Sequence, residues 1–456
     1  MEIFSDTKVY IICPANINSG GPELCHQFVS QLLQFGVDAY VFYLPNKASN
    51  FNTDNPVDKF YVKYHVPYVL KAVDNPKNIL ILNESANEFF ALFKRIRKII
   101  WWMSVDNYLN NLSNIILNHK NNAALRPLTR FFYFDPADKS TEHWVQSEYA
   151  RKFITLNGIE EGRIYTVGDY LSQAFLGMAN KINLAEKENL VAFNPVKGFE
   201  VTQELIKLAP DIDWRPIQNM SPAQVQNLLA SAKVYIDFGN HPGKDRIPRE
   251  AAISGCVVIT GKRGAAANNI DINIPPEFKF SETTADLPKI IDKIHDVFKN
   301  FDANYAKQNE YRTRILDDKN RFAREVAAAF SLNTAKIPDT FAVAQGLTSR
   351  GSYLATIFSN ANSSMKPDFI IDDEFCRKEN AELPFIRRKN NNNFFVTKSD
   401  TAREILIIST DDAKFLYAEG RIKKFILYAP TQTELDDTAA KFNLDMENIL
   451  VANPNN

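Results

Sequence analysis

Short apolar runs alternate with segments of helical periodicity along most of the chain. The run Lys8–Ala15 (KVYIICPA) has the pattern of a buried strand, and residues 22–35 follow it with apolar side chains at helical spacing up to Gly36. Asp38–Leu44 (DAYVFYL) is the next apolar run. This alternation is typical of a parallel sheet whose strands are joined by crossover helices.

The same pattern predicts two α/β domains followed by a smaller α/β extension. In the first domain, further strands are expected at residues 78–82, 99–104, 131–134, 143–146 and 163–167. In the second, strands are expected at 189–193, 213–217, 233–238 and 256–260, and helices at 198–208, 221–232 and 246–254. A β-α-β-α-β pattern then returns with strands at 404–409, 424–428 and 449–452. We place the domains at residues 1–175, 176–335 and 336–456.

Composition favours an ordinary globular protein and excludes several partners. Of 456 residues, 45% are hydrophobic and 23% charged, which argues against intrinsic disorder. The 53 Lys and Arg residues balance 54 Asp and Glu residues, so the formal net charge is -1. A neutral molecule has no overall field that attracts nucleic acid, and no nucleic-acid partner is expected. Any anion site must be local.

The cysteines and the apolar runs indicate a cytoplasmic protein. The four cysteines show no C-x-x-C spacing, and Cys13 and Cys256 lie in apolar runs, as reduced buried thiols do. No signal-peptide pattern opens the sequence, and no apolar run reaches the roughly 18 residues that a membrane span needs.

Glycine is scarce, so the places where it clusters are informative. The chain has 16 glycines, about half the usual frequency of roughly 7%. The first cluster, Gly20-Gly21-Pro22-Glu23, leads into a helix whose free N–H groups suit an anion. Its spacing is not G-x-G-x-x-G, and a tight turn with proline near the helix start explains the residues equally well.

A second candidate follows the strand at 189–193. Lys197 and Gly198 lie in the loop Asn194-Pro195-Val196-Lys197-Gly198, from which a lysine can reach a phosphate as a point charge. The alternative is a solvated lysine on a loop.

The third and strongest candidate is the segment 237–264 (DFGNHPGKDRIPREAAISGCVVITGKRG), which runs from Asp237 through a loop opened by Gly239 to a second loop closed by Gly264. It contains five cations: Lys244, Arg246, Arg249, Lys262 and Arg263. Its acids are Asp237, Asp245 and Glu250. In a neutral protein this excess predicts a local anion site suited to a diphosphate.

Glu250 stands near the start of the helix in this segment, where small residues follow it. At the carboxyl-end crevice of an open α/β sheet, its carboxylate could accept two ribose hydroxyls. Alternatively, Glu250 stabilises its own helix terminus and pairs with Arg246 or Arg249.

Pro248-Arg249-Glu250-Ala251-Ala252 followed by residues 254–259 (SGCVVI) resembles the P-x-x-E-A-x-x-x-G-x-P-V-I segment of GT-B-fold glycosyltransferases. Lys197-Gly198 resembles the family's basic site for the donor diphosphate, and Gly20-Gly21 its N-terminal glycine turn. The resemblance covers roughly residues 8–330. It implies two facing Rossmann-like domains, of which the first is the acceptor side and the second binds a nucleotide-sugar.

By this resemblance the protein moves a sugar from a nucleotide-sugar to a hydroxyl of a glycan or lipid-linked glycan in polysaccharide biosynthesis. The sugar nucleotide is a substrate, so no cofactor is expected. The expected donor-binding residues are Gly20, Gly21, Asn194, Lys197, Gly198, Gly239, Lys244, Arg246, Arg249, Glu250, Arg263 and Gly264. A lipid-linked acceptor would bring the protein to the inner face of the membrane.

The stereochemistry of transfer stays open. Many retaining members of the family carry a second Glu eight positions before the ribose Glu, where this chain has Pro242. An inverting transfer needs a general base, for which Glu23, Asp106 and His241 are the candidates. Asp106 has a competing role as N-cap of the helix that follows it. No metal-ligand spacing occurs among the histidines, and lysine and arginine can carry the leaving-group charge, so we expect no metal.

Two other functions remain alternatives. A sugar-nucleotide epimerase uses the same architecture, and a non-catalytic glycan- or nucleotide-binding relative would also retain the donor loops. In the C-terminal extension, Arg387, Arg388 and Lys389 precede an asparagine run and Phe394-Phe395, which could touch a membrane-linked acceptor. A solvated loop followed by a strand explains these residues better, and the role of 336–456 stays open.

Overall fold

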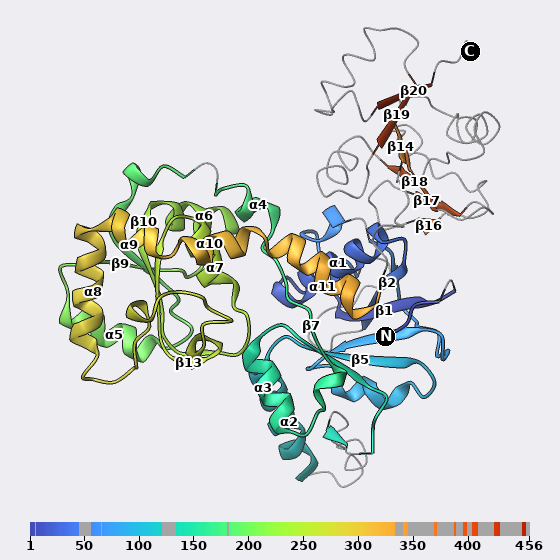
Figure 1. Cartoon of the computed structure of the whole chain (residues 1–456), viewed down its shortest axis with the longest axis horizontal. Coiled ribbons are helices and arrows are strands. Elements are labelled where there is room, and N and C mark those ends of the chain that lie inside the picture. Colours follow the sequence, from blue (N-terminus) through green and yellow to red (C-terminus); the bar gives the residue numbers. More distant parts are fainter. Residues whose placement is uncertain are drawn as a thin grey trace. The chain divides into compact units, whose positions relative to one another are not determined.

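The computed structural model describes residues 1–4, 6–44, 56–64, 66–120, 134–135, 137–179 and 182–332, together with the strands of a sheet that lies beyond them in the sequence. Packing divides the chain into two units (Figure 1). The first unit consists of Met1–Ile3 and Ile79–Ser331, and the second of Phe4–Asn78 and Leu332–Asn456.

The first unit begins with parallel strands in the order β4-β5-β6-β7. Their bounds are β4 Ile79–Asn83, β5 Arg97–Trp102, β6 Glu142–Val145 and β7 Ile164–Thr166. Continuous apolar runs such as ILIL and IIWW form these strands because both faces of a parallel sheet are covered. Helix α2 (Val105–Lys120) follows β5, and α3 (Glu148–Leu156) follows β6.

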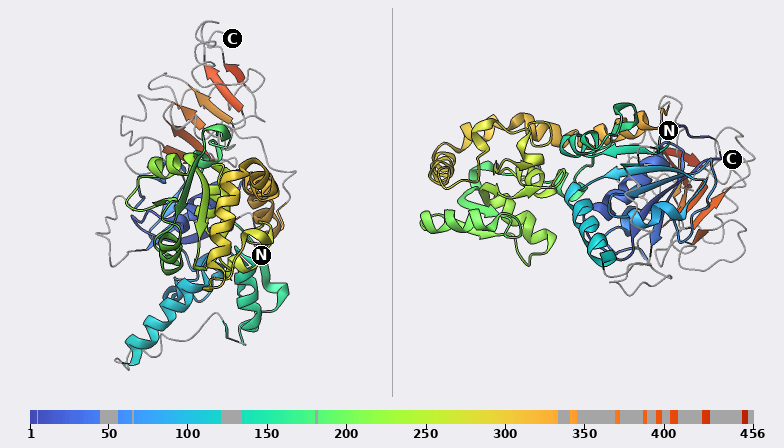
Figure 2. Two further views of the ribbon diagram at one scale, coloured as in Figure 1. Left: turned by 90° about the vertical axis from the view of Figure 1, so that its left-hand side faces the viewer. Right: turned by 90° about the horizontal axis from the view of Figure 1, so that it is seen from below.

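A second parallel sheet in this unit has the order β12-β10-β8-β9. Its strands are β8 Glu188–Phe193, β9 Asp213–Pro216, β10 Ala232–Asp237 and β12 Val257–Thr260. The helices between and after them are α5 Phe199–Leu208, α6 Pro222–Ser231, α7 Arg246–Ile253 and α8 Leu287–Lys299. Helices α5 and α8 contact each other on one side of the sheet, and α6 and α7 on the other (Figure 2).

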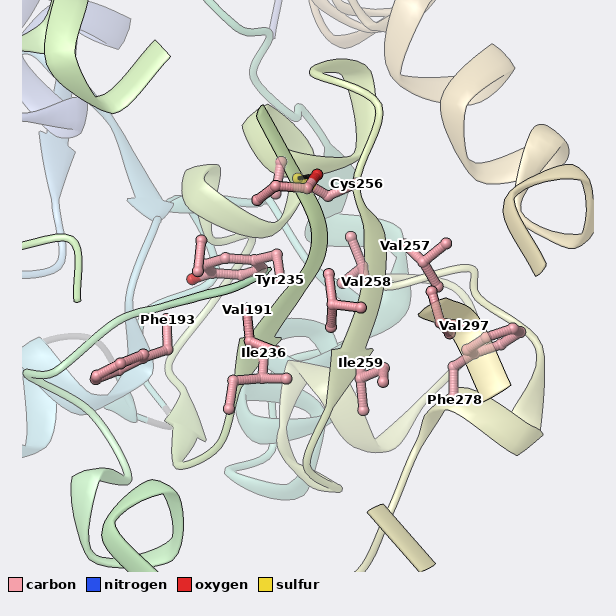
Figure 3. Close-up of a cluster of buried hydrophobic side chains, with 14 of the residues drawn as sticks. Val191, Phe193, Tyr235, Ile236, Cys256, Val257, Val258, Ile259, Phe278 and Val297 are labelled. Atoms are coloured by element: carbon pink, nitrogen blue, oxygen red, sulfur yellow. Dashed lines mark hydrogen bonds between the residues drawn. The ribbon is translucent and has the colours of Figure 1, made fainter. Parts of the chain in front are cut away.

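The core of this sheet is apolar on both faces. Val191, Tyr235 and Val258, from β8, β10 and β12, are all buried, and Phe278 and Val297 belong to the same cluster of buried residues (Figure 3). Burial of large side chains of this kind contributes roughly 1.5–3 kcal/mol each. The strands are therefore rigid supports for the loops at their carboxyl ends.

Shorter elements complete the first unit. The helices are α4 Gln173–Leu176, α9 Phe301–Lys307, α10 Asn309–Leu316 and α11 Asp318–Ala329. The strands β11 (Asn240–His241) and β13 (Arg263–Gly264) form a separate two-stranded ladder. Short 3-10 helices in the described residues connect these elements: η2 Asn87–Leu92, η5 Glu161–Arg163, η6 Leu184–Glu186, η7 Ala265–Ala267 and η8 Pro276–Phe278.

The second unit contains parallel strands in the order β3-β2-β1 and a seven-stranded sheet in the order β16-β17-β18-β15-β14-β19-β20. Its N-terminal elements are β1 Lys8–Pro14, α1 Gly20–Gln34, β2 Asp38–Leu44, η1 Val62–Tyr64 and β3 Tyr68–Val69. Its C-terminal strands are β14 Phe341–Ala344, β15 Phe369–Ile371, β16 Arg387–Arg388, β17 Phe395–Lys398, β18 Glu404–Ile408, β19 Lys424–Tyr428 and β20 Ile449–Ala452. Only β16-β17 and β17-β18 pair antiparallel among them.

The predicted α/β class with parallel sheets is confirmed. The extension is larger in strands than the sequence pattern indicated, because β14, β15 and β16 were not predicted. Strand β17 is the strand expected after the asparagine run, whereas Arg387–Arg388, expected in a loop, form β16. The domain boundaries at residues 175 and 335 stay a prediction, since packing divides the chain differently. The strand expected at 131–134 lies outside the described residues except for Phe134, and so does the asparagine run.

Three of the cysteines, Cys13, Cys25 and Cys256, are buried free thiols, as the sequence predicted, and Cys376 lies outside the described residues. Within the described part of the chain, every helix is too short or too polar to cross a lipid bilayer. The cellular location stays a prediction.

Candidate functional site

Three loops of the first unit meet at the carboxyl edge of the β12-β10-β8-β9 sheet. They are the β8–α5 loop (194–198), the β10–α7 loop (238–245) and the loop after β12 (261–264). The ladder of β11 and β13 joins the last two, with Asn240 paired to Arg263 and His241 to Gly264. The segments that glycine and charge distinguished in the sequence are therefore neighbours in the fold, where ligands of open α/β sheets bind.

Glycine is required where the first two loops touch. A Cβ on Gly198 would lie 1.9 Å from the carbonyl oxygen of Phe238, and one on Gly239 would lie 2.7 Å from the amide nitrogen of Gly198. Both residues also have positive φ, +58° and +118°, which side chains disfavour. The two loops are packed backbone against backbone, so their mutual position is fixed.

Lys197 lies at this junction and is 31% exposed. Its Nζ is 2.7 Å from Oδ2 of Asp245, the N-cap position of α7. The half-buried Asn194 supports the same loop by accepting a hydrogen bond from the N–H of Val196 at 3.0 Å. Gly198 is the N-cap residue of α5, so this ten-residue helix begins directly after Lys197.

His241 is fully buried between two carboxylates. Its Nδ1 is 2.9 Å from Oδ2 of Asp245, and its Nε2 is 3.9 Å from Oδ1 of Asp237. Burial alone would lower the pKa of His241, but the two carboxylates outweigh burial and raise it above the ordinary value. Burial raises the pKa of Asp237, and hydrogen bonds from His241 and Lys197 lower that of Asp245 despite its burial.

The sequence offered His241 as a base or as a proton donor to the leaving phosphate, and this role stays a prediction. The ring has no exposed surface, and both nitrogens face carboxylates of its own unit. His241 connects the end of β10 to the start of α7.

Asp237, His241 and Asp245 also have donor atoms within 4.8 Å of one another, as a metal site needs. The two carboxylates, however, face different nitrogens of the imidazole, Asp245 the Nδ1 and Asp237 the Nε2. A metal ion bound to one ring nitrogen would therefore have only one of the two carboxylates on its side of the ring. Asp245 also holds Lys197. The arrangement fits an imidazole that pairs with Asp245 through Nδ1 and contacts the backbone carbonyl of Asp237 through Nε2 better than a metal centre, and metal independence stays a prediction.

Arg249 lies in a buried ion cluster. Its side chain is 2% exposed, and its terminal nitrogens are 2.6 Å from Asp169 and 3.2 Å from Asp318. Nζ of Lys244 is 3.1 Å from Asp318 and 3.5 Å from Asp169, and Nε of Arg246 is 3.8 Å from Asp169. Burial alone would raise the pKa of Asp169, but these three cations hold it well below its ordinary value.

This cluster changes the expectation that Lys244 and Arg249 hold a diphosphate. Both side chains are paired with carboxylates that no motif in the sequence places beside them, and burial lowers the pKa of Lys244. Both also line a pocket of about 100 Å³ with Tyr311 and Arg314. Arg249 therefore anchors α7 to Asp169 and to the start of α11.

Arg263 is the most exposed of the cations expected to bind the donor, with 46% of its side chain accessible. It pairs with Glu282 and, at 3.4 Å, with Glu200. Glu282 also accepts a hydrogen bond from the N–H of Gly239 at 2.9 Å. The sequence analysis missed Glu282 because it lies in an irregular segment after the sheet, without any motif.

Glu250 is half-buried on α7, although its neighbours Arg249 and Ala251 are buried. Helix α7 begins at Arg246, so Glu250 lies in its second turn, on a helix that contacts β10. Its carboxylate therefore projects from a helix that the Arg249 cluster holds in place.

Asp106 contacts the β10–α7 loop. Its carboxylate accepts a hydrogen bond from the side-chain amide of Asn240. One residue earlier, the N–H of Val105 donates to the carbonyl of Pro242 at 3.0 Å. The N-cap alternative for Asp106 is wrong: α2 begins at Val105, and Ser104 Oγ accepts the N–H of Asn107 at 3.2 Å.

Glu84, directly after β4, is a titratable residue that the sequence analysis missed. Burial raises its pKa to about 7, and backbone N–H groups, that of Met103 first among them at 2.9 Å, only partly oppose this shift. The sequence feature that could have identified Glu84 is an acid directly after the apolar run ILILN, which places it at the same edge of the sheet as Asp106.

The glycine turn at Gly20-Gly21 belongs to the second unit. Helix α1 begins at Gly20, and the N–H of Glu23 donates to the carbonyl of Ser19, so this turn is the start of a helix. Oε1 of Glu23 accepts the hydroxyl of Tyr64 at 2.8 Å. The anion-binding and base roles expected here stay predictions.

No sequence-family profile matches the chain, and no curated protein matches it in sequence. The fold is similar to that of Anabaena HepE, solved in complex with UDP-glucose, at 12% identity and a TM-score of 0.45, over 71% of this chain and 99% of HepE. It is also similar to WaaG, a glycosyltransferase involved in lipopolysaccharide biosynthesis, at 11% identity and a TM-score of 0.44, over 70% of this chain and 99% of WaaG. At these values, the function has to be argued from the site residues.

Proposed function

We propose that the protein is a glycosyltransferase that moves a sugar from a nucleotide-sugar to a hydroxyl of a glycan or lipid-linked glycan, without a metal ion. The junction of the three loops around Gly198 and Gly239 carries this proposal. There, Lys197 and Arg263 offer partly exposed cations, and Glu250 offers a half-buried carboxylate on a fixed helix.

The diphosphate of the donor binds to Lys197, to Arg263 and to the start of α5 at Gly198. An anion there meets free N–H groups at the positive end of a helix, in addition to two charged side chains. Each cation exchanges a carboxylate partner for a phosphate oxygen. Glu250 accepts hydrogen bonds from the ribose hydroxyls, because an ionised carboxylate is an acceptor only.

Asp106 is the base candidate that the first unit brings to the β10–α7 loop. An inverting transfer needs a carboxylate that removes the proton of the acceptor hydroxyl as the bond to the diphosphate breaks. The contact between Asp106 and Asn240 places this carboxylate beside the loop that borders the donor site.

Calorimetric titration of UDP, GDP, ADP and CDP into the full chain tests the donor site. We expect one nucleotide to bind, and Glu250→Ala to raise its dissociation constant at least tenfold with an unchanged melting temperature. Glu204→Ala, which removes an exposed carboxylate on α5, is the matched control and should bind as the wild type does. Equal affinity of the Glu250 variant and the wild type would overturn the assignment.

The transfer step needs a separate measurement. With the nucleotide known, its sugar derivatives are incubated with the protein alone and with a panel of glycans, and the products are followed by NMR. Asp106→Asn should abolish sugar transfer while nucleotide affinity is kept. Conversion of one sugar nucleotide into another without an acceptor would show an epimerase instead.

A further inference from the structure

Glu84 follows β4 directly, at the carboxyl edge of the β4-β5-β6-β7 sheet. The residue is 2% exposed, and one carboxylate oxygen accepts the N–H of Met103 at 2.9 Å. Met103 and Ser104 form the β5–α2 turn, which joins the neighbouring strand β5 to helix α2. A buried carboxylate is costly, so its position against this turn needs a reason.

The β5–α2 turn also meets the β10–α7 loop. A Cβ on Gly243 would lie 2.2 Å from the carbonyl oxygen of Met103, so the two backbones are in close contact. The next residues of α2 provide the Val105 hydrogen bond to Pro242 and the Asp106 hydrogen bond to Asn240. One short turn thus fixes where Asp106 stands relative to that loop.

We propose that Glu84 is a positioning residue for the transfer reaction: its carboxylate holds the β5–α2 turn so that Asp106 points at the β10–α7 loop. This inference rests on the function proposed above, in which Asp106 is the base. Glu84 itself touches no substrate, because its carboxylate is enclosed.

The ionisation of Glu84 then controls the geometry of Asp106. An ionised carboxylate offers only acceptors to the N–H groups of the turn, whereas protonation converts one oxygen into a donor. The elements in contact with the β5–α2 turn carry these charged groups: Asp106 on α2, and His241, Lys244 and Asp245 on the β10–α7 loop. The pKa of Glu84 itself is shifted by burial and, in the opposite direction, by backbone N–H groups. Turnover should therefore fall on the acid side of about pH 7 as Glu84 takes up its proton.

Rate profiles of sugar transfer between pH 5.5 and 9 test the proposal, with wild type, Glu84→Gln and Glu161→Gln. Glu161 lies on the surface and serves as the control for removal of a carboxylate. The wild type and the control should show an acid limb near pH 7. In Glu84→Gln this limb should disappear, and kcat at pH 8 should fall at least fivefold while KM for the donor stays the same.

The possible failures are distinguishable. If the wild type transfers no sugar and binds no nucleotide, the proposed function is wrong. If the wild type is active and Glu84→Gln keeps both the acid limb and the full kcat, the positioning role is wrong. A loss of activity with a lowered melting temperature and an unchanged acid limb would show a merely structural role, and would also overturn the proposal.

Discussion

Replacing Arg249 by methionine tests how the first unit holds α7. The substitution replaces the aliphatic part of the side chain, removes the guanidinium, and leaves Asp169 and Asp318 buried with fewer cations. Removal of one partner from a buried ion pair costs roughly 3–5 kcal/mol. Because Lys244 and Arg246 still face Asp169, we expect a loss of about 3 kcal/mol at pH 7.5, the lower end of that range.

The loss should depend on pH with a defined sign. In the wild type the pKa of Asp169 is depressed, so its ionised form stabilises the fold above the ordinary pKa of 3.8 and this contribution disappears as pH falls further. Without Arg249, the pKa of Asp169 rises, because burial still opposes ionisation and one of the three cations that oppose burial is gone. The variant can then relieve the buried charge by protonation of Asp169. Its loss of unfolding free energy relative to the wild type should therefore be smaller at pH 5 than at pH 7.5.

Urea unfolding followed by tryptophan fluorescence measures this loss. All four tryptophans, Trp101, Trp102, Trp144 and Trp214, lie in the first unit, so the signal reports on that unit. Arg324→Met is the matched control, since Arg324 is 64% exposed in its pair with Asp317 and should contribute at most about 1 kcal/mol. A deficit no larger than that of the control, or one that does not change with pH, would refute the reasoning.

Three further substitutions follow from the same structure. Gly198→Ala should destabilise the first unit by about 1–3 kcal/mol and weaken nucleotide binding, because its Cβ would collide with a carbonyl 1.9 Å away, whereas Gly162→Ala has nothing within 4 Å and should be neutral in the same urea assay. Ser147→Ala should lower the free energy of unfolding by about 1 kcal/mol, since its side chain caps α3. The pKa of Glu84 is about 7 in the folded protein against an ordinary 4.5, so the wild type should lose about 3 kcal/mol of stability as pH rises through this interval. Glu84→Gln should lack this pH dependence of the unfolding free energy. Parallel pH profiles of wild type and variant would contradict the prediction.

Periodicity predicted the regular elements of the second sheet closely. The expected helices at 198–208, 221–232 and 246–254 are α5, α6 and α7 to within a residue at each end. This agreement follows from local signals: Gly198 begins one helix, and Ser221 with Gln224 forms a capping box that begins another. Each boundary is set by residues adjacent in the sequence, which a pattern can detect.

Charge partners could not be predicted in the same way. The sequence showed five cations between Lys244 and Arg263, but their carboxylates come from Asp169, Asp318 and Glu282, outside that segment. Such pairs are set by the packing of distant elements and leave no periodic signal. For the same reason, the burial that shifts the pKa of Glu84 becomes visible only once β4 and β5 are placed side by side.

The strength of each pairing decides which cations can serve a ligand. Arg249 would have to leave two buried carboxylates, at a cost of roughly 3–5 kcal/mol, to bind a phosphate. The partly exposed pairs of Lys197 with Asp245 and of Arg263 with Glu200 are each worth at most about 1 kcal/mol, so a doubly charged diphosphate can displace Asp245 and Glu200 at small cost, while Arg263 keeps its contact with Glu282, whose side chain is 10% exposed. The basic segment therefore has two roles, in which Arg249 fixes the helix that carries Glu250, and Lys197 and Arg263 stay available for exchange.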